Sequence, residues 1–257
     1  MRPTRIAAVA LPIMLPLALA AAPAAAEIVA EPYAYEVDGT PFEGFVAYNS
    51  DLAETRGTVL IVHDWDGLTE YEQRRAEMLA ALGYTAFAID VYGADRRPQS
   101  FEENRAFSGE LYDDRERFRT LLLGAVAEAA NIPGGTEAKL IMGYCFGGAA
   151  VLEAARAGAD VDGFAAFHAG LGTPDGQDWS QTPAPIEFFH GTADPVSGPV
   201  ALAETLVELE EAGVTHEANI YGGARHSFTV FGSDDYDLEA DQASWLGLTM
   251  FLQERLR

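Results

Sequence analysis

The chain has 257 residues, of which 49% are hydrophobic and 22% are charged, a balance typical of one globular α/β domain and not of a disordered or fibrous protein. Its formal net charge of −24 argues against nucleic acid and anionic lipid as partners, because their phosphates require Lys and Arg. We interpret the acidity as a solubility feature, with a preference for cationic substrates as the alternative.

The first 26 residues predict a secretory signal peptide. Arg2 and Arg5 precede an apolar run over 6–22, and "APAAAE" offers an A-x-A cleavage site before Glu27. Two prolines inside the run disfavour a retained membrane helix. We therefore expect an exported protein, periplasmic or secreted, with a single domain over 27–257 and no membrane contact after cleavage.

The remaining chain alternates between strand and helix patterns. Alternating residues around Asp38-Gly39 predict a hairpin over 33–48. Continuous apolar runs predict further strands at 57–63, 84–90, 139–144, 163–169, 185–191 and 217–221. Helical patterns occupy 69–82, 100–130, 146–157, 199–212 and 238–256. This order predicts an α/β fold with a mostly parallel, doubly wound sheet flanked by helices.

The stretch "GYCFGG" holds the only cysteine, Cys145, between a predicted strand and a predicted helix. It fits G-x-C-x-G, a nucleophile elbow with cysteine in place of serine, in which glycines avoid clashes in a tight turn. The start of a helix also lowers the pKa of a thiol. The alternative is a buried structural cysteine. Because a lone cysteine forms no internal disulfide in an exported protein, its retention favours a chemical role.

Two later strand ends supply an acid and a base. Asp194 follows the strand in "FFHGTADPV", and His226 follows the next strand in "YGGARHSFT". Taken singly, Asp194 is explained as a turn residue and His226 as a surface loop residue. The order nucleophile, acid, base is nevertheless that of α/β-hydrolases. We predict that His226 takes the thiol proton and later activates water, while Asp194 fixes the imidazole tautomer.

Backbone amides near two strand ends predict an oxyanion hole. One donor is the amide of Phe146, directly after the cysteine, and the other is the amide of Trp65 in "HDWDG". Tyr92 and His168 are candidate pocket residues, with a packed aromatic and a structural histidine as the alternatives. The sequence has no metal-ligand spacing such as H-E-x-x-H or C-x-x-C, so we expect neither metal nor cofactor.

From about Arg56 to its end, the chain resembles the dienelactone hydrolase family of the α/β-hydrolase fold. The motifs that carry the resemblance are "VHDWDGL", "RRAEMLAALGYTAFAIDVYG", "GYCFGGA", "FHAGL", "HGTADP" and "YGGARHSF". The resemblance implies a Cys145–His226–Asp194 triad that acts on esters or lactones through an acyl-thioenzyme. It also implies that Asp64, where the best-known members carry Glu, contacts the cysteine and helps to form the thiolate.

The chain departs from the family at the arginines that hold a substrate carboxylate. Val230 stands where one is expected after the histidine, and Ala94 stands where we expect the other, with Arg96 and Arg97 close by. We therefore predict a hydrolase of a small-molecule ester or lactone other than the family's namesake substrate. The sequence leaves the oligomeric state open, with a monomer favoured. The alternatives are an inactive hydrolase-fold protein that binds a small apolar ligand, and a peptidase or acyltransferase that uses the same triad.

Overall fold

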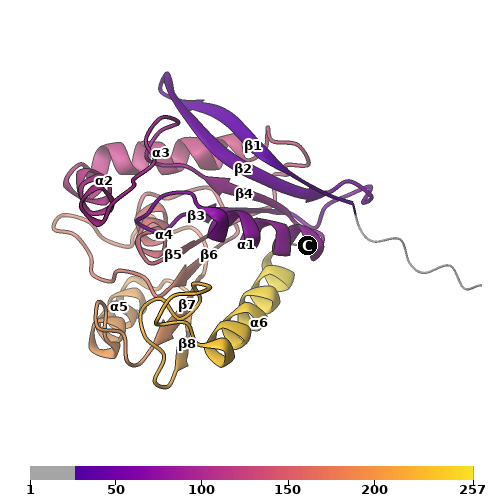
Figure 1. Cartoon of the computed structure of the whole chain (residues 1–257). Coiled ribbons are helices and arrows are strands. Elements are labelled where there is room, and N and C mark those ends of the chain that lie inside the picture. The colour runs from indigo at the N-terminus through magenta and orange to yellow at the C-terminus, as the bar shows by residue number, and fades with distance from the viewer. Residues whose placement is uncertain (1–26, 257) are drawn as a thin grey trace, which may run out of the picture.

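The computed structural model describes residues 27–256, so the predicted signal peptide lies outside the described residues. These residues form one eight-stranded sheet in the order β1-β2-β4-β3-β5-β6-β7-β8 (Figure 1). Strands β3 to β8 pair in parallel, whereas β1 and β2 join as an antiparallel hairpin whose second strand pairs with β4. This is the predicted α/β fold with a mostly parallel sheet.

The elements lie close to the predicted ranges. The strands are β1 (Ile28–Val37), β2 (Thr40–Asn49), β3 (Thr58–Val62), β4 (Thr85–Ile89), β5 (Lys139–Tyr144), β6 (Gly163–Phe167), β7 (Ile186–Gly191) and β8 (His216–Tyr221). The helices are α1 (Glu70–Ala81), α2 (Phe101–Asp113), α3 (Arg115–Glu128), α4 (Phe146–Arg156), α5 (Pro199–Ala212) and α6 (Leu238–Arg255). None of these helices combines the length and the apolar character that crossing a bilayer requires, a finding that covers residues 27–256.

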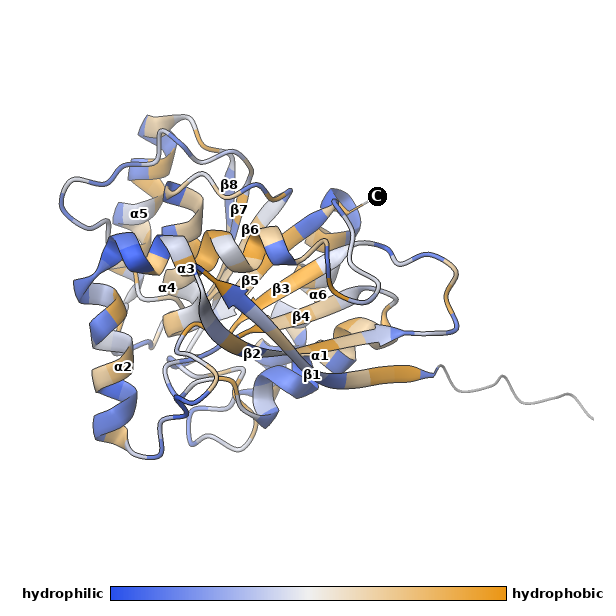
Figure 2. Ribbon diagram, turned by 90° about the horizontal axis from the view of Figure 1, so that it is seen from above, coloured by the Kyte–Doolittle hydropathy of each residue, from blue (hydrophilic) through white to orange (hydrophobic). Residues whose placement is uncertain are grey.

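Alternation along the central strands divides the core into two layers. Leu60 and Val62 of β3 face the cluster formed with α3, α4 and α5, whereas Val59 and Ile61 face the cluster formed with α1 and α6. Both faces of the inner strands are therefore covered, which explains their continuous apolar sequences. Figure 2 shows this apolar centre, with the hydrophilic residues on the outer sides of the helices.

Polar caps set several boundaries. The Thr69 side chain accepts a hydrogen bond at the start of α1, and Glu72 bonds back to the Thr69 amide in a capping box. Within the predicted helical stretch 100–130, Asp114 adopts a non-helical backbone and caps the Arg117 amide at 3.0 Å. The stretch is therefore divided into α2 and α3, a division that composition alone did not locate.

Candidate active site

Cys145 lies in the turn between β5 and α4, with its backbone in a strained conformation of φ 52° and ψ −109°. The strain is tolerated because close backbone packing fixes the turn. A side chain at Gly147 would overlap the carbonyl oxygens of Val62 and His63, and a side chain at Gly143 would overlap Gly147. Glycine is therefore required at both positions, and the turn presents Cys145 half-buried at the carboxyl edge of the sheet.

The structure brings Cys145, His226 and Asp194 together from three strand ends. Cys145 Sγ lies 3.0 Å from His226 Nε2, and His226 Nδ1 lies 2.7 Å from Asp194 Oδ2. The other carboxylate oxygen, Asp194 Oδ1, accepts from the amides of Val196 at 2.7 Å and Ser197 at 2.9 Å. A nucleophile, a base and an orienting acid are thus in hydrogen-bond reach of one another.

Hydrogen bonds to Asp194 lower its pKa by more than burial raises it. Burial acts to raise the pKa of this carboxyl, but the bonds from His226 and from the backbone hold the pKa below its ordinary value. Asp194 is therefore ionised at neutral pH and accepts from His226 Nδ1–H. This arrangement leaves His226 Nε2 free to receive the thiol proton.

The thiol itself is not pre-ionised. Burial raises the pKa of Cys145 well above its ordinary value, and the charge and hydrogen bond of Asp64 raise it further, while the Phe146 amide lowers it. Cys145 is therefore a neutral thiol in the free protein. Two acceptors adjoin it, His226 Nε2 and the Asp64 carboxylate.

The two predicted oxyanion donors, the amides of Phe146 and Trp65, differ in whether a protein group already accepts their hydrogen bond. The Phe146 amide is at the first position of α4 beside the sulfur. The Trp65 amide instead donates to Asp64 Oδ1 at 2.5 Å, so the carboxylate of the preceding residue occupies it. Burial, followed by the charge of Asp66, raises the pKa of Asp64 to about 6. Asp64 must therefore move before the Trp65 amide can bind a substrate oxygen.

The loop that carries Asp64 and Trp65 is held from behind by residues that the sequence analysis did not identify. Glu72, fully buried in α1, accepts from the Asp64 amide at 3.3 Å and the Thr69 amide at 2.8 Å. Burial raises the pKa of Glu72 to about 8. Its position three residues after Thr69 was the one available signal, because it completes a capping box. The capping box predicts a helix start, but only the folded structure shows that Glu72 also holds the loop of Asp64 and Trp65.

Both candidate pocket residues are buried and already hydrogen-bonded. Tyr92 is 3% exposed, and its hydroxyl donates to the Trp65 carbonyl at 2.9 Å. His168 is fully buried, with Nε2 2.8 Å from Thr229 Oγ1 and its ring 5.3 Å from the His226 ring. In these positions Tyr92 holds the loop of Trp65, and the His168 ring packs against the His226 ring.

Tyr112 of α2 is a further neighbour of Cys145, and no sequence pattern predicted its position. Its ring packs edge-on against Phe146 at 5.4 Å, and its hydroxyl lies beside Gly170. Burial and then the charge of Cys145 raise the pKa of Tyr112, which places the phenol in electrostatic reach of the sulfur.

The nearby arginines have other partners. Arg97 donates to Asp90 at 3.0 Å and to the Gly93 carbonyl at 2.9 Å. Arg96 pairs with Glu110 at 2.8 Å and stacks over Phe107 at 4.1 Å. Neither guanidinium replaces the carboxylate-binding arginines whose expected positions hold Val230 and Ala94. Within residues 27–256 the structure also contains no cluster of His, Cys, Asp or Glu that could hold a metal ion.

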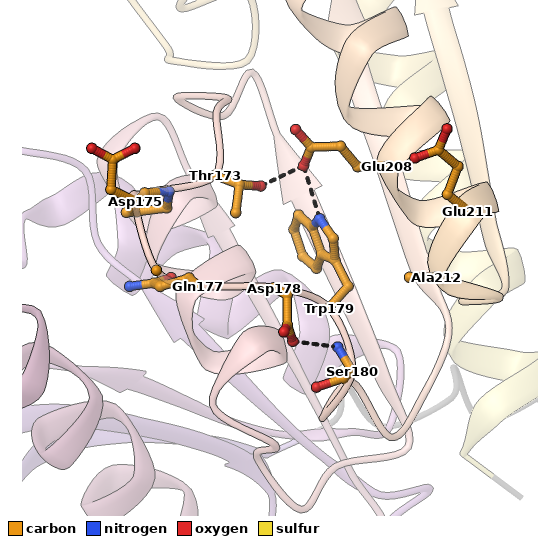
Figure 3. A pocket seen from close by; sticks show the side chains of 11 residues that line it. Thr173, Asp175, Gln177, Asp178, Trp179, Ser180, Glu208, Glu211 and Ala212 are labelled. Atoms are coloured by element: carbon orange, nitrogen blue, oxygen red, sulfur yellow. Dashed lines mark hydrogen bonds between the residues drawn. The ribbon is translucent and has the colours of Figure 1, made fainter.

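A separate pocket of about 580 Å³ lies between the loop after β6 and helix α5 (Figure 3). Glu208 spans it, accepting from the Thr173 hydroxyl at 2.5 Å and from the Trp179 indole at 3.0 Å (Figure 3). These bonds fasten the 171–184 loop to α5. The residues that line this pocket do not include Cys145, Asp194 or His226.

Comparison with known proteins identifies the family of this chain. The family model described as "Dienelactone hydrolase family" matches residues 42–256. A probable 2-oxo-3-(5-oxofuran-2-ylidene)propanoate lactonase from Bradyrhizobium sp is 27% identical over 207 residues, which cover 77% of this chain and 84% of that protein.

Among solved structures, a dienelactone hydrolase-like promiscuous phosphotriesterase from metagenomic libraries has a TM-score of 0.83 at 26% identity, covering 90% of this chain and 99% of that one. A putative dienelactone hydrolase from Klebsiella pneumoniae shares the fold, with a TM-score of 0.79 at 20% identity, 88% of this chain and 98% of that one. The match of the family model over nearly the whole described chain shows that this protein belongs to the dienelactone hydrolase family and is a hydrolase of the ester or lactone type.

Proposed function

We propose that the protein is a cysteine-dependent hydrolase of small carboxylic esters or lactones that works through an acyl-thioenzyme. The observation that carries the proposal is the 3.0 Å contact of Cys145 Sγ with His226 Nε2 at a strained strand-to-helix turn. A structural cysteine needs neither the strained backbone nor a base held in one tautomer by a buried carboxylate. The family membership and the probable lactonase relative support the same reaction class.

The proposed reaction has two stages. The Cys145 thiol gives up its proton, the thiolate attacks the carbonyl carbon, and the Phe146 and Trp65 amides bind the resulting oxyanion. Collapse of this intermediate breaks the ester C–O bond, and the proton goes to the leaving alkoxide, or to the alkoxide end of an opened lactone. His226 then takes a proton from water, whose hydroxide attacks the thioester and releases the acid and Cys145.

Asp64 has two roles in this proposal. In the free enzyme it occupies the Trp65 amide and adds negative charge beside the sulfur, which disfavours thiolate. When the substrate carbonyl enters, it replaces Asp64 at the Trp65 amide, and the displaced carboxylate accepts the thiol proton and passes it to His226 Nε2. The oxyanion hole and the nucleophile would then become ready in the same step.

Asp64→Asn separates these roles. Loss of the charge beside the sulfur should increase the rate of Cys145 alkylation by iodoacetamide at pH 7. Loss of the proton acceptor should decrease kcat/KM for a p-nitrophenyl ester by about 10- to 100-fold. Glu54→Gln, which removes an exposed acid ahead of β3 at the opposite edge of the sheet, is the control. A variant with slower alkylation, or with unchanged kcat/KM, would contradict the assigned roles.

The substrate is proposed to be neutral. Arg96 and Arg97 are engaged elsewhere, and Asp64 places negative charge next to the nucleophile. Trp65 and Phe101 pack edge-to-face at 5.0 Å, and Phe101 is 64% exposed, so an apolar surface adjoins the oxyanion loop. Esters and lactones without a carboxylate should therefore be preferred over a dienelactone that carries one.

The deciding experiment is an ester and lactone panel assayed with the wild type, Cys145→Ala and Cys145→Ser. The panel pairs neutral and carboxylate-bearing substrates, and includes paraoxon because one relative is described as a phosphotriesterase. We expect hydrolysis by the wild type and loss of at least 1,000-fold in Cys145→Ala. Equal turnover in Cys145→Ala would refute the proposal. An unreactive thiol in a ligand-binding, inactive protein would instead support the non-catalytic alternative.

We also propose that the protein acts outside the cytoplasm. Support comes from the basic and apolar pattern of residues 1–26 alone.

A further inference from the structure

A buried chain of hydrogen bonds ends beside the proposed base. Its centre is Thr229, fully buried three residues after His226. Thr229 Oγ1 lies 2.8 Å from the hydroxyl of Tyr71 in α1 and 2.8 Å from His168 Nε2 at the end of β6. The Thr229 carbonyl accepts from Arg75 Nη2, also at 2.8 Å. One threonine therefore joins the loop of the base to α1 and to His168.

Arg75 determines which way the hydrogens point along this chain. It is 1% exposed, pairs with Asp241 of α6 at 2.5 Å, and donates through Nε to the Tyr71 hydroxyl at 3.3 Å. A guanidinium can only donate, so the Tyr71 oxygen accepts from Arg75, and Thr229 Oγ1 is the hydrogen-bonded acceptor that remains for the Tyr71 hydrogen. The Thr229 hydrogen is then directed to His168 Nε2. In this arrangement His168 Nε2 is an acceptor and carries no hydrogen.

The reverse direction is less favourable. If His168 Nε2 donated to Thr229, Thr229 would donate to Tyr71, and the Tyr71 hydrogen would be left without an acceptor in a buried place. His168 Nδ1 is buried and has no partner within residues 27–256 in either arrangement. The forward direction thus leaves one buried polar group unsatisfied and the reverse leaves two, each at a substantial cost.

We propose that the Arg75–Tyr71–Thr229 chain holds His168 as the neutral tautomer with its hydrogen on Nδ1, and that His168 in this form is a positioning residue for His226. The inference builds on the proposed function, because it assigns a role in supporting the proposed base. His168 also has a positive backbone φ of 34°, an uncommon conformation for a non-glycine residue.

The neutral form matters because the two imidazoles are close. The His168 and His226 rings lie 5.3 Å apart at 64°, and His226 gains a positive charge when it takes the thiol proton. A second positive charge at that distance would oppose this step by about two orders of magnitude in the proton equilibrium, at an effective dielectric constant near 20.

Burial and the neighbouring charges both favour the neutral form of His168. Burial lowers the pKa of His168 well below its ordinary value, and the charges of His226, His190 and Arg75 lower it further. His168 therefore remains neutral while His226 is charged. The hydrogen-bond chain then selects which of the two neutral tautomers is present.

Thr229→Val tests the proposal, because it keeps the shape of the side chain and removes the hydroxyl. Thr229→Ser restores the hydroxyl. Thr205→Val is the matched control, since Thr205 is 2% exposed and its hydroxyl only donates to the Ala201 carbonyl within α5. Tyr71→Phe removes the hydroxyl that donates to Thr229, so it should also leave the direction of the Thr229–His168 hydrogen bond undetermined. The tautomer of His168 is read from long-range ¹H–¹⁵N NMR spectra, assigned with His168→Asn, beside kcat and KM for p-nitrophenyl acetate.

We expect the Nδ1–H tautomer in the wild type, Thr229→Ser and Thr205→Val. Thr229→Val and Tyr71→Phe should show a mixture of tautomers. Thr229→Val should also lower kcat by about 10-fold, with KM changed less than twofold, because the substrate contacts remain. A wild-type His168 protonated at Nε2 would overturn the inference, as would a pure Nδ1–H tautomer in both variants or an unchanged kcat in Thr229→Val. The tautomer measurement needs no substrate, so it tests this inference even if the protein is not a hydrolase. The proposed hydrolase activity is tested separately by Cys145→Ala.

Discussion

Asp194→Asn should inactivate the enzyme for a reason that the structure makes specific. The Asp194 Oδ1 atom accepts from two backbone amides, those of Val196 and Ser197. In the variant, the asparagine oxygen must remain on these donors, because turning the NH₂ group toward them would oppose donor to donor. The NH₂ group then faces His226 Nδ1. His226 Nδ1 becomes an acceptor, its hydrogen moves to Nε2, and Nε2 no longer accepts the thiol proton.

The magnitude follows from the lost charge and the wrong tautomer. Asp194 and His226 are 6% and 7% exposed, and their atoms are in contact at 2.7 Å. With charge centres about 4 Å apart and an effective dielectric constant near 20, the attraction between carboxylate and imidazolium is worth about 4 kcal/mol. This corresponds to about 1,000-fold in rate, before any loss from the tautomer is added.

The assay is kcat/KM for p-nitrophenyl acetate with Asp194→Asn and Asp194→Ala side by side. Alanine removes the charge but leaves the tautomer of His226 free, so Asp194→Ala should be no less active than Asp194→Asn. Circular dichroism and thermal unfolding confirm that both variants are folded. An Asp194→Asn variant that keeps more than a tenth of wild-type kcat/KM, or that exceeds Asp194→Ala, would refute the reasoning about forced orientation.

Three other predictions concern the turn, the buried acid and the N-terminus. Gly147→Ala should abolish activity, because its Cβ would overlap backbone at the end of β3, whereas Gly109→Ala in α2 meets no atom within 4 Å and should stabilise the fold by about 0.5–1 kcal/mol in urea unfolding. The Glu72 pKa of about 8 exceeds its ordinary 4.5, so the stability it contributes is present below pH 4.5 and is lost as the pH rises toward 8. Glu72→Gln should therefore show a flatter dependence of unfolding free energy on pH between 5 and 8, and parallel curves would contradict this. Mass spectrometry of the protein expressed with its full sequence should find Glu27 as the first residue, and an intact residue 1 would disprove cleavage.

Much of the fold was predictable because local patterns agree with tertiary structure. Continuous apolar runs marked the strands that are covered on both faces, and helical spacing of apolar residues marked the helices that cover them. We expected Cys145, Asp194 and His226 to lie close together because functional groups gather at the carboxyl ends of parallel strands. Each of these conclusions depends on a few neighbouring residues or on chain order.

Contacts between distant segments were not predictable. Tyr71 and Thr229 are 158 residues apart, and Arg75 and Asp241 are 166 apart, so no local pattern connects them. The bond from the Trp65 amide to Asp64 joins adjacent residues, yet it depends on a loop conformation that Glu72 and Tyr92 hold. The position of Tyr112 beside the nucleophile depends in the same way on the packing of α2.

The arrangement of the sheet has a practical consequence for attaching this enzyme to a surface or to a second protein. The triad lies at the carboxyl edge, whereas Ile28 pairs with Asn49 at the far end of the β1–β2 hairpin, and Leu256 lies beside Gly57 ahead of β3 (Figure 1). Both ends of the described chain therefore emerge at the edge opposite Cys145. A linker joined at either end would leave the catalytic edge open to substrate, which suits the protein to immobilisation or fusion without redesign.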